Sequence, residues 1–217
     1  MNFDFKNSRL FRIDVAENLI MNYPVQKYLS CLGDCPYFKK FSGETVFYTN
    51  SKRGIFFYNK LKQCSSKGIP ISDEYKQYKG KMLRIELRFT SRLTDEFGKE
   101  IYVYDLYNKT FFTNILNKWL HHYSSILKIN KFIYRDTDDL TTSDYLDRML
   151  AKYIKRHGVN KILKDIDCNR DNFSSSVEAS RCKKAIKDIV NSREYTVRNK
   201  LISELNKKVR QTVLKYT

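Results

Sequence analysis

The sequence predicts an α+β protein in which an antiparallel sheet with flanking helices precedes a helical C-terminal region. Two patterns predict this fold class. From residue 8 to about residue 107 apolar and polar residues mostly alternate, as in half-buried strands. From about residue 108 apolar residues recur at helical spacing instead. We therefore place a sheet domain at residues 1–130 and a basic helical region at residues 131–217.

The first expected strand lies at residues 10–15. Arg12 and Asp14 there alternate with apolar neighbours, so that both polar side chains share one face. A short helix is expected at residues 24–33, because Pro24 is well tolerated in a first helical turn.

A hairpin and one further strand complete the expected sheet. Residues 44–50 and 54–60 are strand-like segments joined by a short polar turn, which is the pattern of a hairpin. Residues 63–73 contain Gly and Pro and are expected to form a loop. Residues 82–89 alternate cleanly, with Arg and Glu on one side and apolar residues on the other. A strand face carrying Arg and Glu faces either solvent or an active site.

Helices are expected in the second half of the chain. One helix has the apolar stripe Phe112, Ile115, Leu116, Trp119, Tyr123 and Ile126. The next begins after Thr142-Ser143-Asp144, where Ser or Thr can cap it, and ends at Gly158. Its expected apolar stripe is Leu146, Met149, Leu150 and Tyr153. Further helices are expected at residues 159–165, 177–191 and 195–214, with a polar break at residues 168–176.

The composition indicates a folded, strongly basic protein. The 217 residues are 41% hydrophobic, and their net charge of +17 favours a polyanionic partner, most often nucleic acid. Residues 1–107 hold 18 Lys and Arg against 12 Asp and Glu, and residues 108–217 hold 23 against 12. The helical half is therefore expected to bind the phosphate backbone. No apolar run approaches the roughly 18 residues of a membrane span, so we expect no membrane partner.

Cysteine and histidine give weaker signals. An odd number of scattered cysteines favours reduced thiols and a cytoplasmic location, although Cys31 and Cys35 have the spacing of half a zinc site. His121, His122 and His157 are expected at the surface. The helices around Gly158 fit a helix-turn-helix or a simple bundle corner, and the bundle corner is the favoured interpretation. The five cysteines are Cys31, Cys35, Cys64, Cys168 and Cys182.

Tyr58 is a candidate nucleophile. In a strand, Phe56, Tyr58 and Lys60 share one face. A tyrosine hydroxyl has a pKa near 10 and needs a nearby cation, such as Lys60, to attack a phosphate. The alternative is that Tyr58 is one of sixteen tyrosines, a residue type favoured in strands.

Asp14 and Glu86 are candidate metal ligands. Each lies in an otherwise apolar strand segment beside arginine, and two facing carboxylates repel unless a cation lies between them. Oxygen ligands suit Mg²⁺ or Mn²⁺. The alternative is a pair of ion pairs on a solvated face, formed by Arg12 with Asp14 and by Arg88 with Glu86.

Four segments together resemble a known family of DNA-replication proteins. They are Arg-Ile-Asp-Val-Ala-Glu-Asn (12–18), Thr-Val-Phe-Tyr-Thr-Asn-Ser (45–51), Ile-Phe-Phe-Tyr-Asn-Lys (55–60) and Leu-Arg-Ile-Glu-Leu-Arg (83–88). Asp105-Leu106-Tyr107 before a helix with Trp119 continues the likeness. The series resembles rolling-circle replication initiators of the filamentous-phage gene II/X type, and is similar to the Rep_trans plasmid initiators. The resemblance covers about residues 8–127.

The resemblance implies an HUH-endonuclease-like antiparallel sheet in which carboxylates replace the usual histidine pair as metal ligands. It implies that Tyr58 attacks the scissile phosphodiester and leaves a 5′-phosphotyrosine and a free 3′-OH. Asp14 and Glu86 fall on the metal-binding strands of the pattern. The expected activity is site-specific nicking and religation of one DNA strand at an origin, with Mg²⁺ or Mn²⁺ as cofactor.

Two features depart from the family pattern. Gln63 stands where the family usually has an acid, so it would be a neutral third ligand. Only about ten residues precede the Arg-x-Asp segment, so we expect a reduced sheet or a shortened chain. Both departures favour the alternative function, a non-enzymatic DNA-binding or replication-regulatory protein that keeps the initiator fold.

The expected partners are single-stranded or supercoiled origin DNA, a host helicase and polymerase, and a second copy of the chain. Tyr48 or Tyr107 could serve as a second tyrosine in strand transfer. The residues expected to contact DNA are Arg12, Lys52, Arg53, Arg84, Arg88, Lys155 and Arg156.

Overall fold

The computed structural model describes residues 5–90, 92–132 and 140–217. The chain forms two compact units. The first unit holds the described residues of Met1–Ser30, Asp34–Ile126 and Glu204–Thr217, and the second holds those of Cys31–Gly33 and Leu127–Ser203. The domain boundary expected at residue 130 stays a prediction, because compactness alone does not test which part folds independently.

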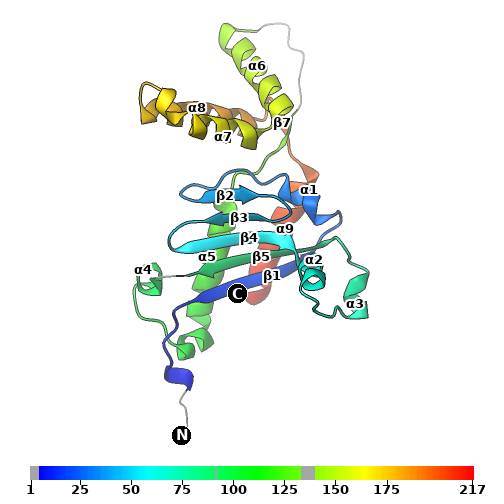
Figure 1. The fold of residues 1–217 in the computed structure, drawn as a ribbon, viewed down its shortest axis with the longest axis vertical. Coiled ribbons are helices and arrows are strands. Elements are labelled where there is room, and N and C mark those ends of the chain that lie inside the picture. Colours follow the sequence, from blue (N-terminus) through cyan, green and yellow to red (C-terminus); the bar gives the residue numbers. More distant parts are fainter. Residues whose placement is uncertain (1–4, 91, 133–139) are drawn as a thin grey trace. The chain divides into compact units, whose positions relative to one another are not determined.

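A five-stranded antiparallel sheet dominates the first unit (Figure 1), which confirms the predicted α+β class. The strand order is β1-β5-β4-β3-β2, so β5 lies between β1 and β4 and pairs with both. The strands are β1 (Ile13–Ile20), β2 (Lys39–Ser42), β3 (Val46–Thr49), β4 (Arg53–Asn59) and β5 (Met82–Phe89).

One face of this sheet carries the hydrophobic core. Helix α5 (Lys109–Ser125) and the C-terminal part of α9 (Lys200–Tyr216) pass behind the sheet in Figure 1. Phe57 of β4 contacts Tyr123 of α5, whose hydroxyl donates to Asn206 of α9 at 2.5 Å. Burying each large apolar side chain stabilises the fold by about 1.5–3 kcal/mol. Fully buried side chains on this face include Tyr48, Ile55, Phe57, Leu83, Ile85, Leu87 and Phe89.

Short helices lie at the ends of the strands. The expected loop at residues 63–73 is wrong at its start, because α2 (Lys60–Ser66) follows β4 directly and the Asn59 side chain caps it by accepting from the Lys62 amide. Lys60 is therefore the first residue of a helix and not a strand residue. The remaining short elements are η1 (Phe5–Asn7), α1 (Val25–Leu29), α3 (Asp73–Lys76), α4 (Leu93–Phe97) and η2 (Val103–Tyr107).

The second unit is mainly helical, as expected. Helix α6 (Thr142–His157) begins with a capping box between Thr141 and Asp144. Gly158 ends it at a φ of 82°, a conformation that costs glycine little. The other elements are β6 (Lys131–Phe132), α7 (Val159–Cys168), η3 (Arg170–Asn172), α8 (Ser176–Asn191) and β7 (Thr196–Val197). Its core includes Ala151, Ile154, Leu163, Ile186, Ile189 and Val190.

Several expected apolar positions are corrected. On α6 the buried residues are Ala151 and Ile154, while Leu146, Met149 and Tyr153 are exposed, because apolar residues occur on both sides of this helix. In the first turn of α5 Phe111 is buried and Phe112 is exposed, whereas Ile115, Leu116, Trp119 and Tyr123 are buried as predicted.

Residues near the start of the sheet and on α5 also differ from expectation. Phe11 is exposed because β1 begins at Ile13 and not at residue 10. His122 is buried on α5, and burial lowers its pKa to about 4, so it is neutral near pH 7 and is not a surface histidine.

Glu204 fixes the C-terminal helix α9 to the sheet unit. Its carboxylate accepts hydrogen bonds from the Tyr28 hydroxyl at 2.5 Å, the Asn22 amide at 2.9 Å and Lys208 Nζ at 2.7 Å. Lys208 Nζ also donates to the carbonyl of Ile20, at the end of β1. Burial alone would raise the pKa of Glu204, but the bonds from Lys208, Tyr28 and Asn22 lower it below its ordinary value. The ionised form therefore stabilises the native state.

We predict that Glu204→Gln lowers the free energy of unfolding by about 1–3 kcal/mol near pH 7, because charged hydrogen bonds are lost in a mostly buried site. Urea unfolding measures this difference. A carboxyl whose folded pKa is lowered contributes stability above its unfolded pKa and loses it as pH falls through the folded value. The difference between the two proteins should therefore shrink below about pH 4.5. Glu74→Gln, exposed on α3, is the control and should change little; an equal loss in both variants would contradict the account.

Candidate active site on the open face of the sheet

The second face of the sheet carries the polar residues of the site. We call it the open face, because the described helices of the first unit lie behind the sheet or at its ends (Figure 1). Strand pairing places its residues in rows across β1, β5 and β4. The three rows are Asn18–Arg84–Tyr58, Ala16–Glu86–Phe56 and Asp14–Arg88–Gly54.

Glu86 is the centre of this arrangement. It is only 6% exposed, and three neighbouring side chains donate hydrogen bonds to it. Arg88 Nε lies 2.5 Å from Oε1, while the Tyr58 hydroxyl and Arg84 Nε lie 2.9 Å and 3.3 Å from Oε2. Arg84 also donates to Asn18 Oδ1 at 3.2 Å. These contacts compensate the cost of burying a carboxylate.

The same contacts move the pKa values of Glu86 and Tyr58 in opposite directions. Burial would raise the pKa of Glu86, but hydrogen bonds from Arg88, Tyr58 and Arg84 lower it, so Glu86 is ionised at neutral pH. The pKa of Tyr58 is raised by burial first, and then by its bond to Glu86. Arg84 and Gln63 act in the other direction on Tyr58. In this state Tyr58 is a protonated hydrogen-bond donor and Glu86 is the adjacent proton acceptor.

Tyr58 belongs to the open face and not to the core between sheet and helices. Neighbouring side chains still leave it only 8% exposed. A phosphate that reaches its hydroxyl must therefore displace part of the surrounding network. Arg84 and Arg88 are the cations that already lie in that network.

Asp14 lies diagonally from Glu86 on the open face. Arg12 binds it through two hydrogen bonds, from Nε at 2.7 Å and from Nη2 at 2.6 Å. Arg88 Nε lies 3.8 Å from Asp14 and so contacts both carboxylates. The ion pairs of Arg12 with Asp14 and of Arg88 with Glu86, the alternative considered from the sequence, are both present.

Lys60 and Gln63 lie together at the start of α2. Lys60 Nζ donates to Gln63 Oε1 at 2.9 Å. Gln63 also interacts with the Tyr58 hydroxyl, and this interaction acts to lower the pKa of Tyr58 against the larger effect of burial. Lys60 is helical, but it contacts Gln63, and Gln63 in turn interacts with the Tyr58 hydroxyl.

The other expected DNA contacts lie elsewhere. Lys52 pairs with Asp95 at 2.9 Å beside the turn before β4. Arg53 points to the core side of the sheet, where its Nε binds Glu96 at 2.6 Å. Lys155 and Arg156 lie in the last turn of α6, in the second unit, and both stay predicted DNA contacts.

The donor chemistry of the site fits a hard divalent cation. Asp14 and Glu86 supply carboxylate oxygens and Gln63 supplies an amide oxygen, which are ligand types that Mg²⁺ and Mn²⁺ accept. In the described structure these oxygens accept from Arg12, Arg88 and Lys60. Within the described ranges, no three His, Cys, Asp or Glu side chains are close enough together to hold a metal ion.

Three features of the open face were not predicted from the sequence. Strand β2 was not expected, and neither was the position of its Phe41 opposite Phe47. Asn18, which accepts from Arg84, was also missed. The segment Lys39-Lys40-Phe41-Ser42 shows no apolar/polar alternation, and four residues are too few to distinguish a strand from a loop.

We predict that Glu86→Gln moves the Tyr58 pKa down toward its ordinary value near 10, because the nearby negative charge is removed while burial remains. A ¹³C NMR titration of tyrosine Cζ measures this pKa, and Tyr58→Phe identifies the resonance. Glu44→Gln is the matched control, since Glu44 is exposed and pairs with Lys62. An unchanged Tyr58 titration in Glu86→Gln would contradict the described contact.

Comparison with known proteins identifies the family. A family model for the N-terminal part of the phage replication-associated gene II protein matches residues 2–125, more than half of the chain. The match covers all five strands of the sheet and α5. A search of curated proteins found no match. In the part of the chain that the structure describes, no helix has both the length and the apolar character needed to cross a membrane. The chain therefore belongs to the family of phage replication-associated gene II proteins, which are initiators of rolling-circle DNA replication.

Proposed function

We propose that this protein nicks and rejoins one strand of origin DNA, with Tyr58 as the nucleophile. Membership of the initiator family supports a role in rolling-circle replication with DNA as partner. The observation that carries the finer proposal is the hydrogen bond from the Tyr58 hydroxyl to the ionised Glu86, among the arginines of the open face. A nucleophile, a proton acceptor and phosphate-binding cations are the groups that this reaction needs.

In the proposed reaction Tyr58 Oη attacks the phosphorus of the scissile phosphodiester. The new bond joins Oη to phosphorus, and the bond from phosphorus to the 3′ oxygen breaks. The phenol proton passes to Glu86 and then to the departing 3′ oxygen, so protons balance and a 5′-phosphotyrosine and a free 3′-OH result. Rejoining is the reverse reaction, with the 3′-OH as nucleophile.

The arginines have a second role in this proposal. Arg88 contacts both carboxylates, and Arg84 contacts Glu86. A phosphate that enters the open face is another anion that these guanidinium groups can bind, through two parallel N–H···O hydrogen bonds each. Moving Arg84 off Glu86 toward the phosphate would leave the Tyr58–Glu86 bond in place and bring positive charge to the reacting oxygens.

A bound Mg²⁺ or Mn²⁺ would polarise the phosphoryl oxygen, and the groups proposed to hold it are Asp14, Gln63 and the oxygen of Glu86 that is not bonded to Tyr58. Gln63 contributes no charge, so most of the affinity would come from the two carboxylates. A host helicase, a polymerase and a second copy of the chain stay predictions.

A second function is favoured by a specific observation. Both carboxylates of the site are already neutralised by arginine, and Gln63 is bonded to Lys60. These contacts suit a protein that binds DNA without cutting it and regulates replication. The two functions differ in whether a covalent protein–DNA adduct forms.

We predict that the protein, incubated with single-stranded or supercoiled origin DNA and Mn²⁺, forms an adduct that survives a denaturing gel. Tyr58→Phe should abolish the adduct, because the nucleophilic oxygen is missing, while DNA binding is retained. Chelation by EDTA should reduce the adduct, because the proposed ion assists the attack.

Two tyrosines serve as controls for this experiment. Tyr48 is completely buried on the core face of the sheet, and Tyr107 is exposed at the end of η2. Tyr48→Phe and Tyr107→Phe should both leave the adduct intact. DNA binding by the unmodified protein without any adduct would reject the nickase and support the regulatory function.

A further inference from the structure

Three phenylalanines from three neighbouring strands form a row on the open face. Phe41 of β2 is paired with Phe47 of β3, and Phe47 is paired with Phe56 of β4. The ring centroids are 4.6 Å and 5.6 Å apart, and the ring planes differ by only 10° and 14°. We call these three residues the phenylalanine row. It runs across the strands from the edge of the sheet toward Glu86.

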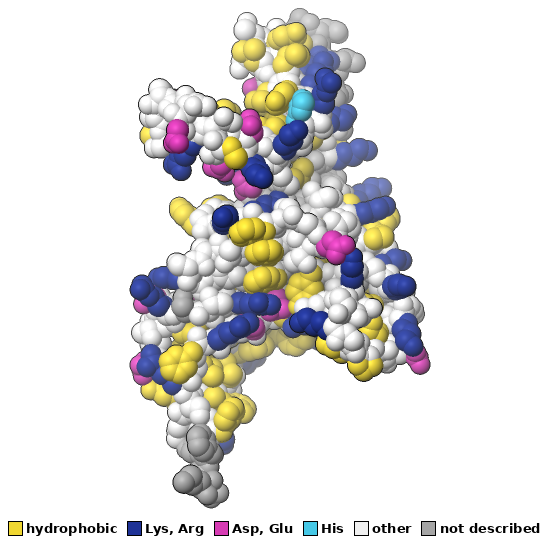
Figure 2. All heavy atoms as spheres, in the orientation of Figure 1, with side chains coloured by type: hydrophobic (Ala, Val, Ile, Leu, Met, Phe, Trp, Pro, Cys, Tyr) yellow, Lys and Arg dark blue, Asp and Glu magenta, His cyan; other side chains and the backbone are white. Residues whose placement is uncertain are grey.

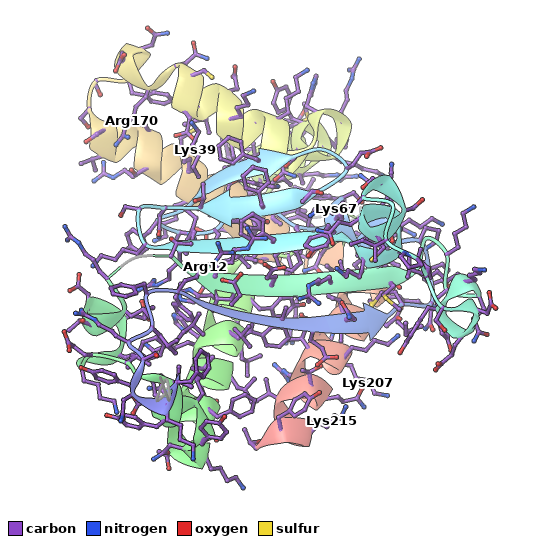
Figure 3. All side chains as sticks on the ribbon, turned by 60° about the horizontal axis from the view of Figure 1, so that its bottom comes forward. Arg12, Lys39, Lys67, Arg170, Lys207 and Lys215 are labelled. Carbon is purple, nitrogen blue, oxygen red and sulfur yellow. The ribbon has the colours of Figure 1, made fainter. Side chains whose placement is uncertain are left out.

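A cation lies at each end of the phenylalanine row. Lys39 Nζ is 5.2 Å from the centre of the Phe41 ring, and Arg88 Cζ is 4.0 Å from the centre of the Phe56 ring. Figure 2 shows hydrophobic side chains in a row over β2, β3 and β4, with Lys and Arg side chains beside it. In Figure 3, Lys39 stands at the β2 edge and Arg12 near the β1 edge of the same sheet.

The row is not part of the hydrophobic core. Phe41 is 37% exposed, and Phe47 and Phe56 are half-buried, whereas their strand neighbours Val46 and Phe57 are buried on the other face. Gly54 leaves room for the ring of Phe56, because a Cβ at Gly54 would lie 2.6 Å from Cε2 of Phe56.

The chemistry of the row selects among partners. Unpaired bases have flat apolar faces, and these faces stack on aromatic rings whatever the base sequence. Each base is also linked to a phosphate that a nearby Lys or Arg can bind. Duplex DNA offers phosphates but hides its base faces. The rings of the row already stack on one another, so a base would contact the exposed parts of these rings that the neighbouring ring does not cover. The cation at each end of the row can bind the phosphate of that base.

We propose that Phe41, Phe47 and Phe56, together with Lys39 and Arg88, bind unpaired bases of single-stranded DNA. Phe56 precedes Tyr58 by two residues on the same face of β4, so bases on the row would lie next to the scissile phosphate. This last position rests on the proposed nicking function, whereas binding of single strands by the row does not. Arg88, which contacts Phe56 and Glu86 together, connects the row to the site.

The test is fluorescence anisotropy with three labelled probes of equal length: oligothymidylate, a strand with abasic sites in place of its bases, and a duplex. The unmodified protein should bind oligothymidylate about 5- to 150-fold more tightly than the abasic strand, since stacking contributes this much per base. Phe47→Leu and Phe41→Leu, which keep apolar volume but remove the ring, should reduce that preference and leave abasic binding unchanged.

The matched control is another exposed aromatic stack. Tyr102 and Tyr104 near η2 stack with centroids 5.5 Å apart and planes differing by 3°, and Tyr104 is 48% exposed. Tyr104→Leu should retain the full preference for oligothymidylate. Equal binding of oligothymidylate and the abasic strand by the unmodified protein would overturn the proposal, and that result does not depend on the folding of any variant.

The failure of this proposal is distinguishable from failure of the nickase. A Tyr58-dependent adduct with no base preference overturns the row and leaves the nickase intact. A base preference lost in Phe47→Leu, in a protein that forms no adduct, supports the row and overturns the nickase. Loss of abasic and oligothymidylate binding by the same factor in Phe47→Leu would also overturn the row, because the ring would then affect phosphate contacts only.

Discussion

The buried carboxylate of Glu86 is the interaction on which the open face depends. Glu86 lies on β5, the strand between β1 and β4, where Tyr58, Arg84 and Arg88 all donate to it. Removing any of these donors leaves a buried charge with fewer partners, at a cost of about 1–3 kcal/mol. The contacts that make burial of Glu86 tolerable also orient the Tyr58 hydroxyl and hold two guanidinium groups beside it. Stability and the proposed chemistry therefore depend on the same four side chains.

The two faces of the sheet have different roles in the first unit. One face buries Ile85, Leu87 and Phe57 against α5 and α9, and it fixes the strands in register. The other face can then carry charged and aromatic side chains at positions set by that register. Arg88 links the parts of this face, because it contacts Asp14, Glu86 and the ring of Phe56. A DNA phosphate that competes for Arg88 would therefore influence both the carboxylates and the phenylalanine row.

Elements with a strong local pattern could be predicted from the sequence, and elements without such a pattern could not. β5 was correctly predicted because residues 83–89 alternate without interruption, and Tyr58 and Glu86 were singled out individually. Tyr58 and Glu86 are 28 residues apart in the chain, and their contact depends on the pairing of β4 with β5. Periodicity does not specify which strands pair. The prediction of which side of α6 is buried was wrong, because apolar residues occur on both sides of that helix. Lys60 was assigned to the strand because the Asn59 cap that starts α2 was not recognised.

The central claim is that the Tyr58 oxygen is the atom that joins the protein to DNA. Tryptic digestion of the covalent adduct followed by mass spectrometry tests this claim most directly. Cleavage after Arg53 and Lys60 isolates residues 54–60, in which Tyr58 is the only tyrosine. The account predicts that this peptide carries the 5′-phosphonucleotide. Attachment to any other tyrosine, such as Tyr48 or Tyr107, would contradict it.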